Sequence, residues 1–273
     1  MHGAGNDFVL LDGLRAPISP QLDIAALAQL LCPRHFGVGA DGLLSLERSE
    51  IADARMRMWN PDGTPDMCGN GLRCVAQLAH QLGYINKDNF TIETIAGIRE
   101  VERLKDGRIR AAMGVPQFAP AIVPIATETP LVDGMLEIDG QILPNVTALS
   151  TGSTHTVIFR DAPLGEAEYQ TLSPLLEHHP LFPARTSIMW AVADGADQFK
   201  IRIWERGAGE TLACGTGACA VAVAAIATKR ARGPVTVESR GGELEVEWNG
   251  AESEITLTGR ATYVYAGTWA QSG

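Results

Sequence analysis

The sequence lacks any apolar run of the roughly 18 to 20 residues that cross a lipid bilayer. Its first residues, Met-His-Gly-Ala-Gly-Asn-Asp, also lack the basic and then apolar order of a secretory signal peptide. We therefore expect these 273 residues to form a cytoplasmic protein that makes no contact with a membrane.

Positive charge is scarce as well. The chain has 22 Lys and Arg residues against 32 Asp and Glu residues, a formal net charge of −10. No basic stretch could replace the counterions of nucleic-acid phosphates, so we expect no nucleic-acid partner. Charged residues make up 20% and apolar residues 45% of the chain, which is typical of a folded protein rather than a disordered one.

Signals for cofactors and metals are few. The chain has only four lysines, and none lies in a glycine-rich motif where it could form a Schiff base with pyridoxal phosphate. Five cysteines occur, but their Cys-x5-Cys and Cys-x4-Cys spacings have no HxxxH partner and do not favour zinc. No GxSxG nucleophile motif is present. We therefore expect neither a cofactor nor a metal ion.

One glycine pattern needs a separate interpretation. Gly37, Gly39 and Gly42 formally match the dinucleotide-binding pattern GxGxxG. No apolar strand leads into this pattern and no capped helix clearly leaves it, so a glycine turn into a strand is the better interpretation.

The chain does contain a near-duplication. Residues 55–74 read RMRMWNPDGTPDMCGNGLRC, and residues 200–219 read KIRIWERGAGETLACGTGAC. In each stretch an alternating, strand-like run ends in Trp, a glycine-rich loop follows, and a Cys-Gly pair begins a helical pattern. Cys214 follows Cys68 by 146 residues (214 − 68), which we take as the length of the repeated unit.

The flanking patterns repeat too, since strand patterns at 90–114 have counterparts at 234–259 and residues 5–12 resemble residues 152–161. We therefore predict two pseudo-symmetric domains, one formed by 1–113 plus 260–273 and the other by 114–259. A Pro-rich stretch at 116–130 would join them. Helical spacing also predicts a helix at 22–32, a helix with one buried stripe after Cys68, and an almost wholly apolar helix at 218–228 that is buried on all sides.

Each half thus offers one thiol at a helix N-terminus. Such an end carries about half a positive charge and several unpaired backbone N–H groups, which favour a thiolate over a thiol. The same N–H groups, at Gly69-Asn70 and Gly215-Thr216, can hold a carboxylate. If the halves face one another across a cleft, one thiolate removes an α-proton while the opposite thiol delivers another. The pattern therefore predicts inversion of a carbon centre by two bases.

For a single Cys-Gly pair, a buried cysteine beside a tight turn is the ordinary alternative. The matching contexts of Cys68 and Cys214 favour the functional interpretation. Cys74 and Cys219 fall on helix interiors and Cys32 near a helix end, so we interpret these three as core residues.

These residues resemble the diaminopimelate epimerase family of cofactor-independent enzymes. The blocks that match are MHGAGNDFVLLDG, FGVGADGLL, WNPDGTPDMCGNGLRC, WERGAGETLACGTGACA and GRATYVYAG, which together extend nearly from end to end. The resemblance implies an α/β (α+β) fold of two similar domains, each a mixed or antiparallel β-barrel around a central helix, with the active site in the interdomain cleft. It also implies that Cys68 and Cys214 are the acid–base pair that interconverts L,L- and meso-diaminopimelate, in lysine and peptidoglycan precursor biosynthesis.

The resemblance assigns further roles residue by residue. His155 and Glu205 would adjust the thiol pKa values, and Tyr265 would lie at a homodimer contact. Contacts with the amino-acid substrate would fall on Asn6, Asn60, Gly69, Asn70, Glu205, Arg206, Gly215 and Thr216. Three of these residues have ordinary alternatives: Asn60 can belong to a plain turn, Arg206 to the solvated surface, and His155 to the core.

Two positions depart from the family pattern. This chain has Ser153 where the family has the asparagine of GNPH, and Ser187 where the family usually has a second asparagine. Both asparagines would contact the far, non-reacting end of diaminopimelate, and a serine hydroxyl holds a carboxylate less firmly than an amide or holds it through water. Three hypotheses therefore stand: diaminopimelate epimerase, a racemase or epimerase of another amino acid with the same design, and a non-catalytic amino-acid-binding protein. Retention of both cysteines argues against the third.

Overall fold

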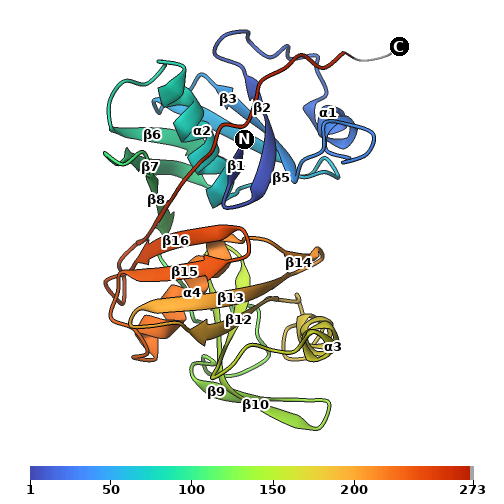
Figure 1. Cartoon of the computed structure of the whole chain (residues 1–273), viewed down its shortest axis with the longest axis vertical. Helices are drawn as coiled ribbons and strands as arrows, with labels where there is room; N and C mark the ends of the chain where they lie inside the picture. Colours follow the sequence, from blue (N-terminus) through green and yellow to red (C-terminus); the bar gives the residue numbers. More distant parts are fainter. Residues whose placement is uncertain (271–273) are drawn as a thin grey trace. The chain divides into compact units, whose positions relative to one another are not determined.

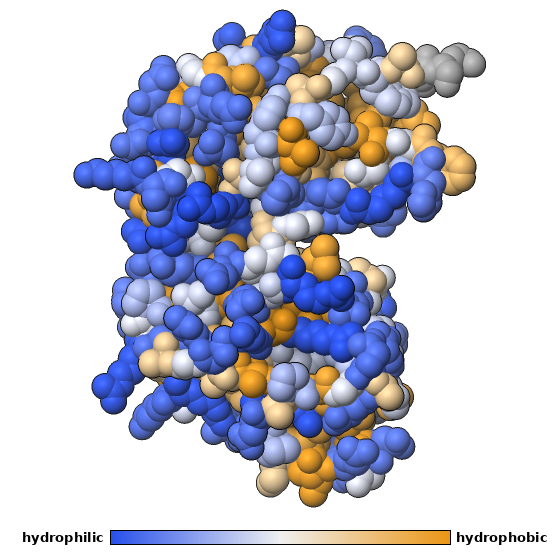
Figure 2. Space-filling view, in the orientation of Figure 1, coloured by the Kyte–Doolittle hydropathy of each residue, from blue (hydrophilic) through white to orange (hydrophobic). Residues whose placement is uncertain are grey.

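The structure, a computed structural model, describes residues 1–270. It divides into two compact units, residues 1–111 together with 258–270, and residues 112–257 (Figure 1). Among the described residues, no helix is both long and apolar enough to span a bilayer. In Figure 2, hydrophilic residues cover most of the visible face of each unit and apolar residues form small patches among them.

The first unit is a mixed sheet with two helices. Its elements are β1 (His2–Gly3), β2 (Asn6–Asp12), α1 (Ile24–Leu31), β3 (Gly42–Glu47), β4 (Ala54–Trp59), β5 (Pro65–Asp66), α2 (Gly69–Gln81), β6 (Asn89–Thr94) and β7 (Gly97–Arg103), followed by β8 (Ile109–Gly114), which runs across the boundary. Strand β2 pairs parallel with β3, β3 antiparallel with β4, and β4 parallel with β6. Strands β6, β7 and β8 form an antiparallel meander.

The second unit repeats this arrangement. Its elements are β9 (Gly134–Ile138), β10 (Gln141–Ser150), β11 (Thr154–Arg160), α3 (Glu166–Glu177), β12 (Ser187–Ala193), β13 (Gln198–Glu205), β14 (Gly209–Thr211), α4 (Gly215–Ala227), β15 (Val235–Ser239) and β16 (Gly242–Glu247), followed by β17 (Ile255–Gly259), which runs across the boundary. Strand β11 pairs parallel with β12, β12 antiparallel with β13, and β13 parallel with β15, in the order of β2, β3, β4 and β6. The predicted α/β fold with two pseudo-symmetric halves is confirmed.

Each unit has one central helix that the sheet packs against. In α2 the apolar stripe that includes Leu72, Val75 and Ala79 is buried against Phe8 and Ile92. Helix α4 contacts β10, β11, β12, β15 and β16, and its small side chains are buried from Gly217 to Ala225. Small residues all round a helix permit this because strands can approach it from every side.

Part of the architecture differs from the prediction. The stretch 116–130 does not run free between the units, because Val123 and Ile125 are buried in the core of the second unit. The hairpin of β9 and β10 and the helix α3, which the sequence patterns did not indicate, complete this core through Leu136, Tyr169 and Leu176.

Candidate active site

Cys68 occupies the N-cap position of α2, with an extended backbone at φ −133° and ψ 124°. Its Sγ lies 3.4 Å from Oδ1 of Asn6, at the start of β2. The same oxygen accepts a hydrogen bond of 3.2 Å from Nδ2 of Asn70, in the first turn of the helix. Three of the predicted site residues of the first unit therefore meet at one helix end.

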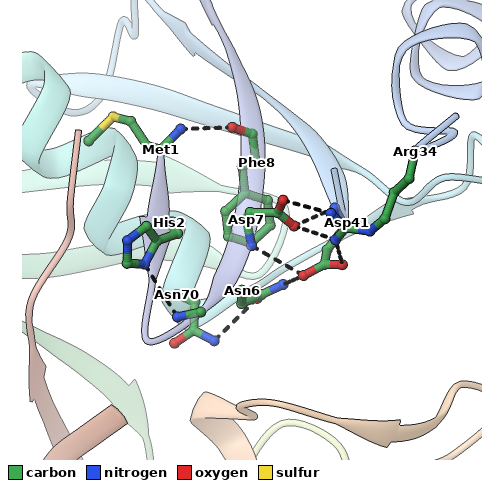
Figure 3. A network of polar contacts seen from close by, with 9 residues as sticks. Met1, His2, Asn6, Asp7, Phe8, Arg34, Asp41 and Asn70 are labelled. Atoms are coloured by element: carbon green, nitrogen blue, oxygen red, sulfur yellow. Dashed lines mark hydrogen bonds and ion pairs between the residues drawn. The ribbon is translucent and has the colours of Figure 1, made fainter. Parts of the chain in front are cut away.

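A charged network that sequence reasoning missed orients Asn6 (Figure 3). The amide of Asn6 donates to Asp41 at 2.7 Å, and Arg34 bridges Asp41 and Asp7 through contacts of 2.7 Å and 2.6 Å. Burial alone would raise the pKa of Asp7, but hydrogen bonds and charge from Arg34 outweigh it and lower the pKa. Asp41 accepts from the Asn6 amide, which leaves the Asn6 oxygen for Cys68.

Arg73 is a second residue that the sequence did not single out. It is fully buried, and its guanidinium donates to the carbonyl of Gly69 at 3.3 Å and to the side-chain oxygen of Asn70. These partners lie four and three residues earlier on one helix face, so Arg73 holds the first turn of α2 from within.

Cys214 occupies the equivalent N-cap position of α4, at φ −135° and ψ 112°, and is 8% exposed. Its Sγ accepts a hydrogen bond of 3.3 Å from the backbone N–H of Gly217 and lies 3.4 Å from Oγ1 of Thr216. A helix N–H donating to sulfur favours the thiolate form, as the sequence argument expected.

The first backbone N–H groups of both helices remain available. No described residue accepts a hydrogen bond from the backbone N–H of Gly69, Asn70, Gly215 or Thr216. Such groups at a helix start can bind a carboxylate. Each unit therefore presents a thiol beside a potential anion site.

His155 is buried on β11, with 1% of its surface exposed. Burial, with a smaller effect from the charge of Arg206, lowers the pKa of this imidazole to about 3. Its Nε2 lies 3.0 Å from the hydroxyl of Ser153, which in turn lies 3.4 Å from the hydroxyl of Thr216. His155 is therefore a neutral imidazole that the Ser153 hydroxyl links to Thr216 in the first turn of α4.

Glu205 is the last residue of β13, and Arg206 begins the loop that follows. The carboxylate of Glu205 accepts from the Thr211 hydroxyl, and the backbone N–H of Arg206 donates to Oγ of Ser187 at 3.1 Å. The Arg206 guanidinium donates to the carbonyl of Ala184 at 3.1 Å and forms no ion pair with any carboxylate in residues 1–270. An exposed guanidinium that is not paired with a carboxylate is available to an anionic ligand.

The carboxylate that supports this loop, Glu177, was not predicted. It is buried at the end of α3 and accepts from Nε1 of Trp204 and the N–H of Gly207, both at 2.8 Å. Burial would raise the pKa of Glu177, but these hydrogen bonds lower it below its usual value. Since α3 itself was not predicted, no sequence signal could have placed Glu177 here.

The other predicted residues lie at the edges of these clusters. The side-chain amide of Asn60 donates within its own turn, to Thr64 at 3.1 Å and to Asp66 at 3.3 Å. Tyr265 is 65% exposed on the surface of its chain. Asn60 thus lies in a turn, which was the alternative to a role in substrate binding, and its side chain remains near the surface.

The three remaining cysteines behave as core residues, as predicted. Cys32, Cys74 and Cys219 are all buried. Burial, aided by the carboxylates of Asp41 and Asp7, raises the pKa of Cys32 to about 11, and burial raises the pKa of Cys74 to about 12. Neither of these two thiols can supply a base near neutral pH.

Solved structures with similar folds include two classes of protein. A PhzF-family phenazine biosynthesis protein from Bacillus anthracis superposes with a TM-score of 0.65 at 20% identity, covering 97% of this chain and 93% of that one. A hydroxyproline epimerase from Agrobacterium vitis superposes with a TM-score of 0.65 at 18% identity, covering 96% and 87%. The fold and the paired N-cap cysteines together define a two-unit α/β protein with one thiol at the start of each central helix.

Sequence comparison identifies the family. The family profile described as diaminopimelate epimerase matches residues 1–119 and 147–264. A diaminopimelate epimerase from Moorella thermoacetica is 41% identical over 98% of this chain and 96% of its own length, and one from Synechocystis is 42% identical over 97% and 96%. The chain belongs to the diaminopimelate epimerase family, as the matching blocks indicated, and is an isomerase.

Proposed function

We propose that the protein interconverts L,L- and meso-diaminopimelate by proton transfer at the α-carbon, with Cys68 and Cys214 as the two bases. One thiolate removes the α-proton, and the other thiol donates a proton to the opposite face of the carbon, so each turnover exchanges the roles of the two cysteines. The observation that carries the proposal is that a cysteine is the N-cap residue of the central helix in each unit, α2 or α4. It lies next to backbone N–H groups that donate to no described residue.

The substrate contacts follow from the same geometry. The N–H groups of the two helix starts would bind the α-carboxylate and stabilise the negative charge that develops as the proton leaves. Arg206 would bind the second carboxylate of the substrate, because no described carboxylate occupies its guanidinium. The thiols would then lie on opposite faces of the bound amino acid.

An isotope experiment tests this function. In deuterated water, L,L-diaminopimelate should gain α-deuterium and yield meso product, and Cys68→Ser and Cys214→Ser should each lower epimerisation by at least about a hundredfold. Cys32→Ala, which removes a thiol outside the site, is the matched control and should stay active. Full activity of either serine variant would contradict the two-base mechanism.

A racemase or epimerase of another amino acid is the second candidate, and the contacts of two serines favour it. The hydroxyl of Ser153 contacts His155 and Thr216, and the hydroxyl of Ser187 accepts from Arg206 N–H. Both serines are thus engaged within the protein and contribute less to the far end of diaminopimelate than two free amides would. Deuterium incorporation into a different amino acid, with none into diaminopimelate, would decide for this candidate.

We further propose a cytoplasmic homodimer that has Tyr265 at the contact and a small-molecule amino acid as its only other partner. The large exposed area of Tyr265 on its own chain supports the dimer. Sedimentation of the purified protein at the mass of two chains is the expected result.

A further inference from the structure

Three contacts link His155 to Cys214 within the second unit. Nε2 of His155 lies 3.0 Å from Oγ of Ser153, and that oxygen lies 3.4 Å from Oγ1 of Thr216. Oγ1 of Thr216 lies 3.4 Å from Sγ of Cys214. The four groups form one continuous chain of polar atoms that ends on the thiol.

The first unit shows what occupies the equivalent positions. Asn6 holds the position of Ser153 in the repeat and Asn70 the position of Thr216. The Asn6 oxygen contacts Cys68 directly at 3.4 Å and Asn70 at 3.2 Å. A serine side chain is shorter than an asparagine side chain, and in the second unit the threonine hydroxyl completes the path to the sulfur.

The repeat also explains why the polar contacts of the second unit end at His155. Phe8, which aligns with His155, is 3% exposed and packs in the core of the first unit. An imidazole at this position gives the Ser153 hydroxyl a polar partner that the first unit does not offer. The two thiols therefore have different hydrogen-bonding environments despite the repeated fold.

A chain of hydroxyl groups can run in either direction, because each hydroxyl both donates and accepts. When Cys214 is a thiolate, Thr216 donates to the sulfur. When Cys214 is a thiol, Thr216 accepts from it. His155 can serve both states because its Nε2 accepts in one neutral tautomer and donates in the other. Its Nδ1 has no hydrogen-bond partner among the described residues, so no second contact selects one tautomer.

We propose that Ser153 is a positioning residue for Cys214: it joins Thr216 to His155 and holds the threonine hydroxyl against the sulfur as the cysteine changes between thiol and thiolate. This inference rests on the proposed role of Cys214 as a base. It assigns the Ser153 hydroxyl to the thiol rather than to the far end of the substrate.

The other charged groups near α4 take no part in this series of polar contacts. Arg206 acts on His155 through its charge, and the Glu205 carboxylate is bound by Thr211. Strands β10 and β12 carry no titratable side chain, and Arg160 on β11 pairs with Glu168. The carboxylates of β15 and β16 alternate with the buried apolar residues of those strands and so point away from the helix: Glu238, Glu243, Glu245 and Glu247.

The pH dependence of thiol alkylation tests the proposal. Iodoacetamide labelling of Cys214 is followed by mass spectrometry between pH 5 and pH 10, with Cys68 in the same sample as an internal reference. Ser153→Ala should move the midpoint of Cys214 labelling upward by about one pH unit, since the thiolate loses a supported hydrogen bond. Labelling of Cys68 should not move.

A second variant and a double variant make the test specific. Thr216→Val interrupts the chain from the helix side, so the test survives if Ser153→Ala does not fold. Thr216→Val should shift the midpoint at least as far as Ser153→Ala. The double variant should shift it no further, because both substitutions break the same series of contacts. Ser153→Thr keeps a hydroxyl and should restore most of the native midpoint. Thr228→Ala, at the opposite end of α4, is the matched control and should leave the midpoint unchanged.

An unchanged midpoint in Ser153→Ala, or additive shifts in the double variant, would overturn the proposal. Because alkylation needs no substrate, the result is independent of the epimerase assay. A shifted midpoint in a protein that does not epimerise diaminopimelate would preserve the role of Ser153 and reject only the proposed substrate.

Discussion

His155 is a histidine whose surroundings keep it uncharged. Burial, with a smaller contribution from the charge of Arg206, lowers its pKa to about 3 in the folded protein, against 6.5 as the usual value. Its aligned partner Phe8 lies in the core of the first unit. The second unit thus has a polar but neutral ring, linked to Cys214 through Ser153 and Thr216, where the first unit has an apolar one.

The lowered pKa predicts how stability depends on pH. Below about pH 6.5 the unfolded chain takes up a proton at this residue and the folded chain does not, so the stabilising contribution is complete above that pH and is lost as pH falls toward 3. Between pH 7 and pH 5 the free energy of unfolding should fall by about 1 to 2 kcal/mol more in the native protein than in His155→Gln. Urea unfolding at both pH values measures the difference.

The exposed His178 supplies the control for this experiment. His178→Gln removes an exposed imidazole, so only the difference that His155→Gln makes beyond it reports the buried ring. If His155→Gln and the native protein lose equal stability on acidification, His155 is not held neutral by burial.

The Cys-Gly motif shows how far local sequence determines an element. The glycine after each cysteine begins a helix at the predicted place, Gly69 in α2 and Gly215 in α4. The prediction succeeded because N-cap geometry and helical spacing are encoded within a few residues. The support of the same helices could not be predicted, because Asn6 and Arg34 reach Cys68 through contacts between residues 27 to 62 positions apart.

The second glycine of each Cys-Gly-x-Gly motif, Gly71 or Gly217, has a packing role that the sequence did not indicate. A Cβ atom at Gly217 would lie 2.6 Å from Sδ and Cε of Met189 and 3.2 Å from Cβ of Cys214. A Cβ at Gly71 would lie 3.0 Å from Cδ2 of Leu44. Glycine lets the first turn of each helix approach the strand beneath it, which fixes the position of the thiol.

This close approach predicts the effect of Gly217→Ala. Alanine is favoured over glycine in a helix by about 1 kcal/mol, but overpacking against Met189 costs about 1 to 3 kcal/mol. We expect a net loss of stability, measured by urea unfolding. When Gly217→Ala is introduced into the Met189→Ala variant, where the obstructing atoms are absent, the further loss relative to Met189→Ala alone should be smaller. Gly165→Ala, where a Cβ meets nothing within 4 Å, should change stability little. A Gly217→Ala variant more stable than the native protein would show that Met189 moves aside at no cost.

At the scale of the whole molecule, the duplication is the feature that the sequence revealed most completely. The order of parallel and antiparallel pairings is the same in the two units, from β2 to β6 and from β11 to β15. Strand periodicity and the 146-residue offset carry this information. Helix α3 escaped prediction because its apolar stripe of Tyr169, Leu172 and Leu176 is interrupted by Pro174, which is unusual inside a helix.

The proposed two-base mechanism requires the thiols of Cys68 and Cys214 to approach closely enough to oxidise together, and this links the repeated fold to a chemical test. With diamide as oxidant, Cys68 and Cys214 should each lose one hydrogen and form a disulfide, while diamide takes up both hydrogens. Activity should be lost and then return with dithiothreitol. Peptide mass spectrometry should find the Cys68 and Cys214 peptides linked, while Cys32 and Cys74 stay reduced because burial holds their thiols protonated. Cys68→Ser should give no linked peptide. If the oxidised protein is inactive but these two peptides are not linked, the two thiols do not act on the same α-carbon, and the two-base mechanism is contradicted.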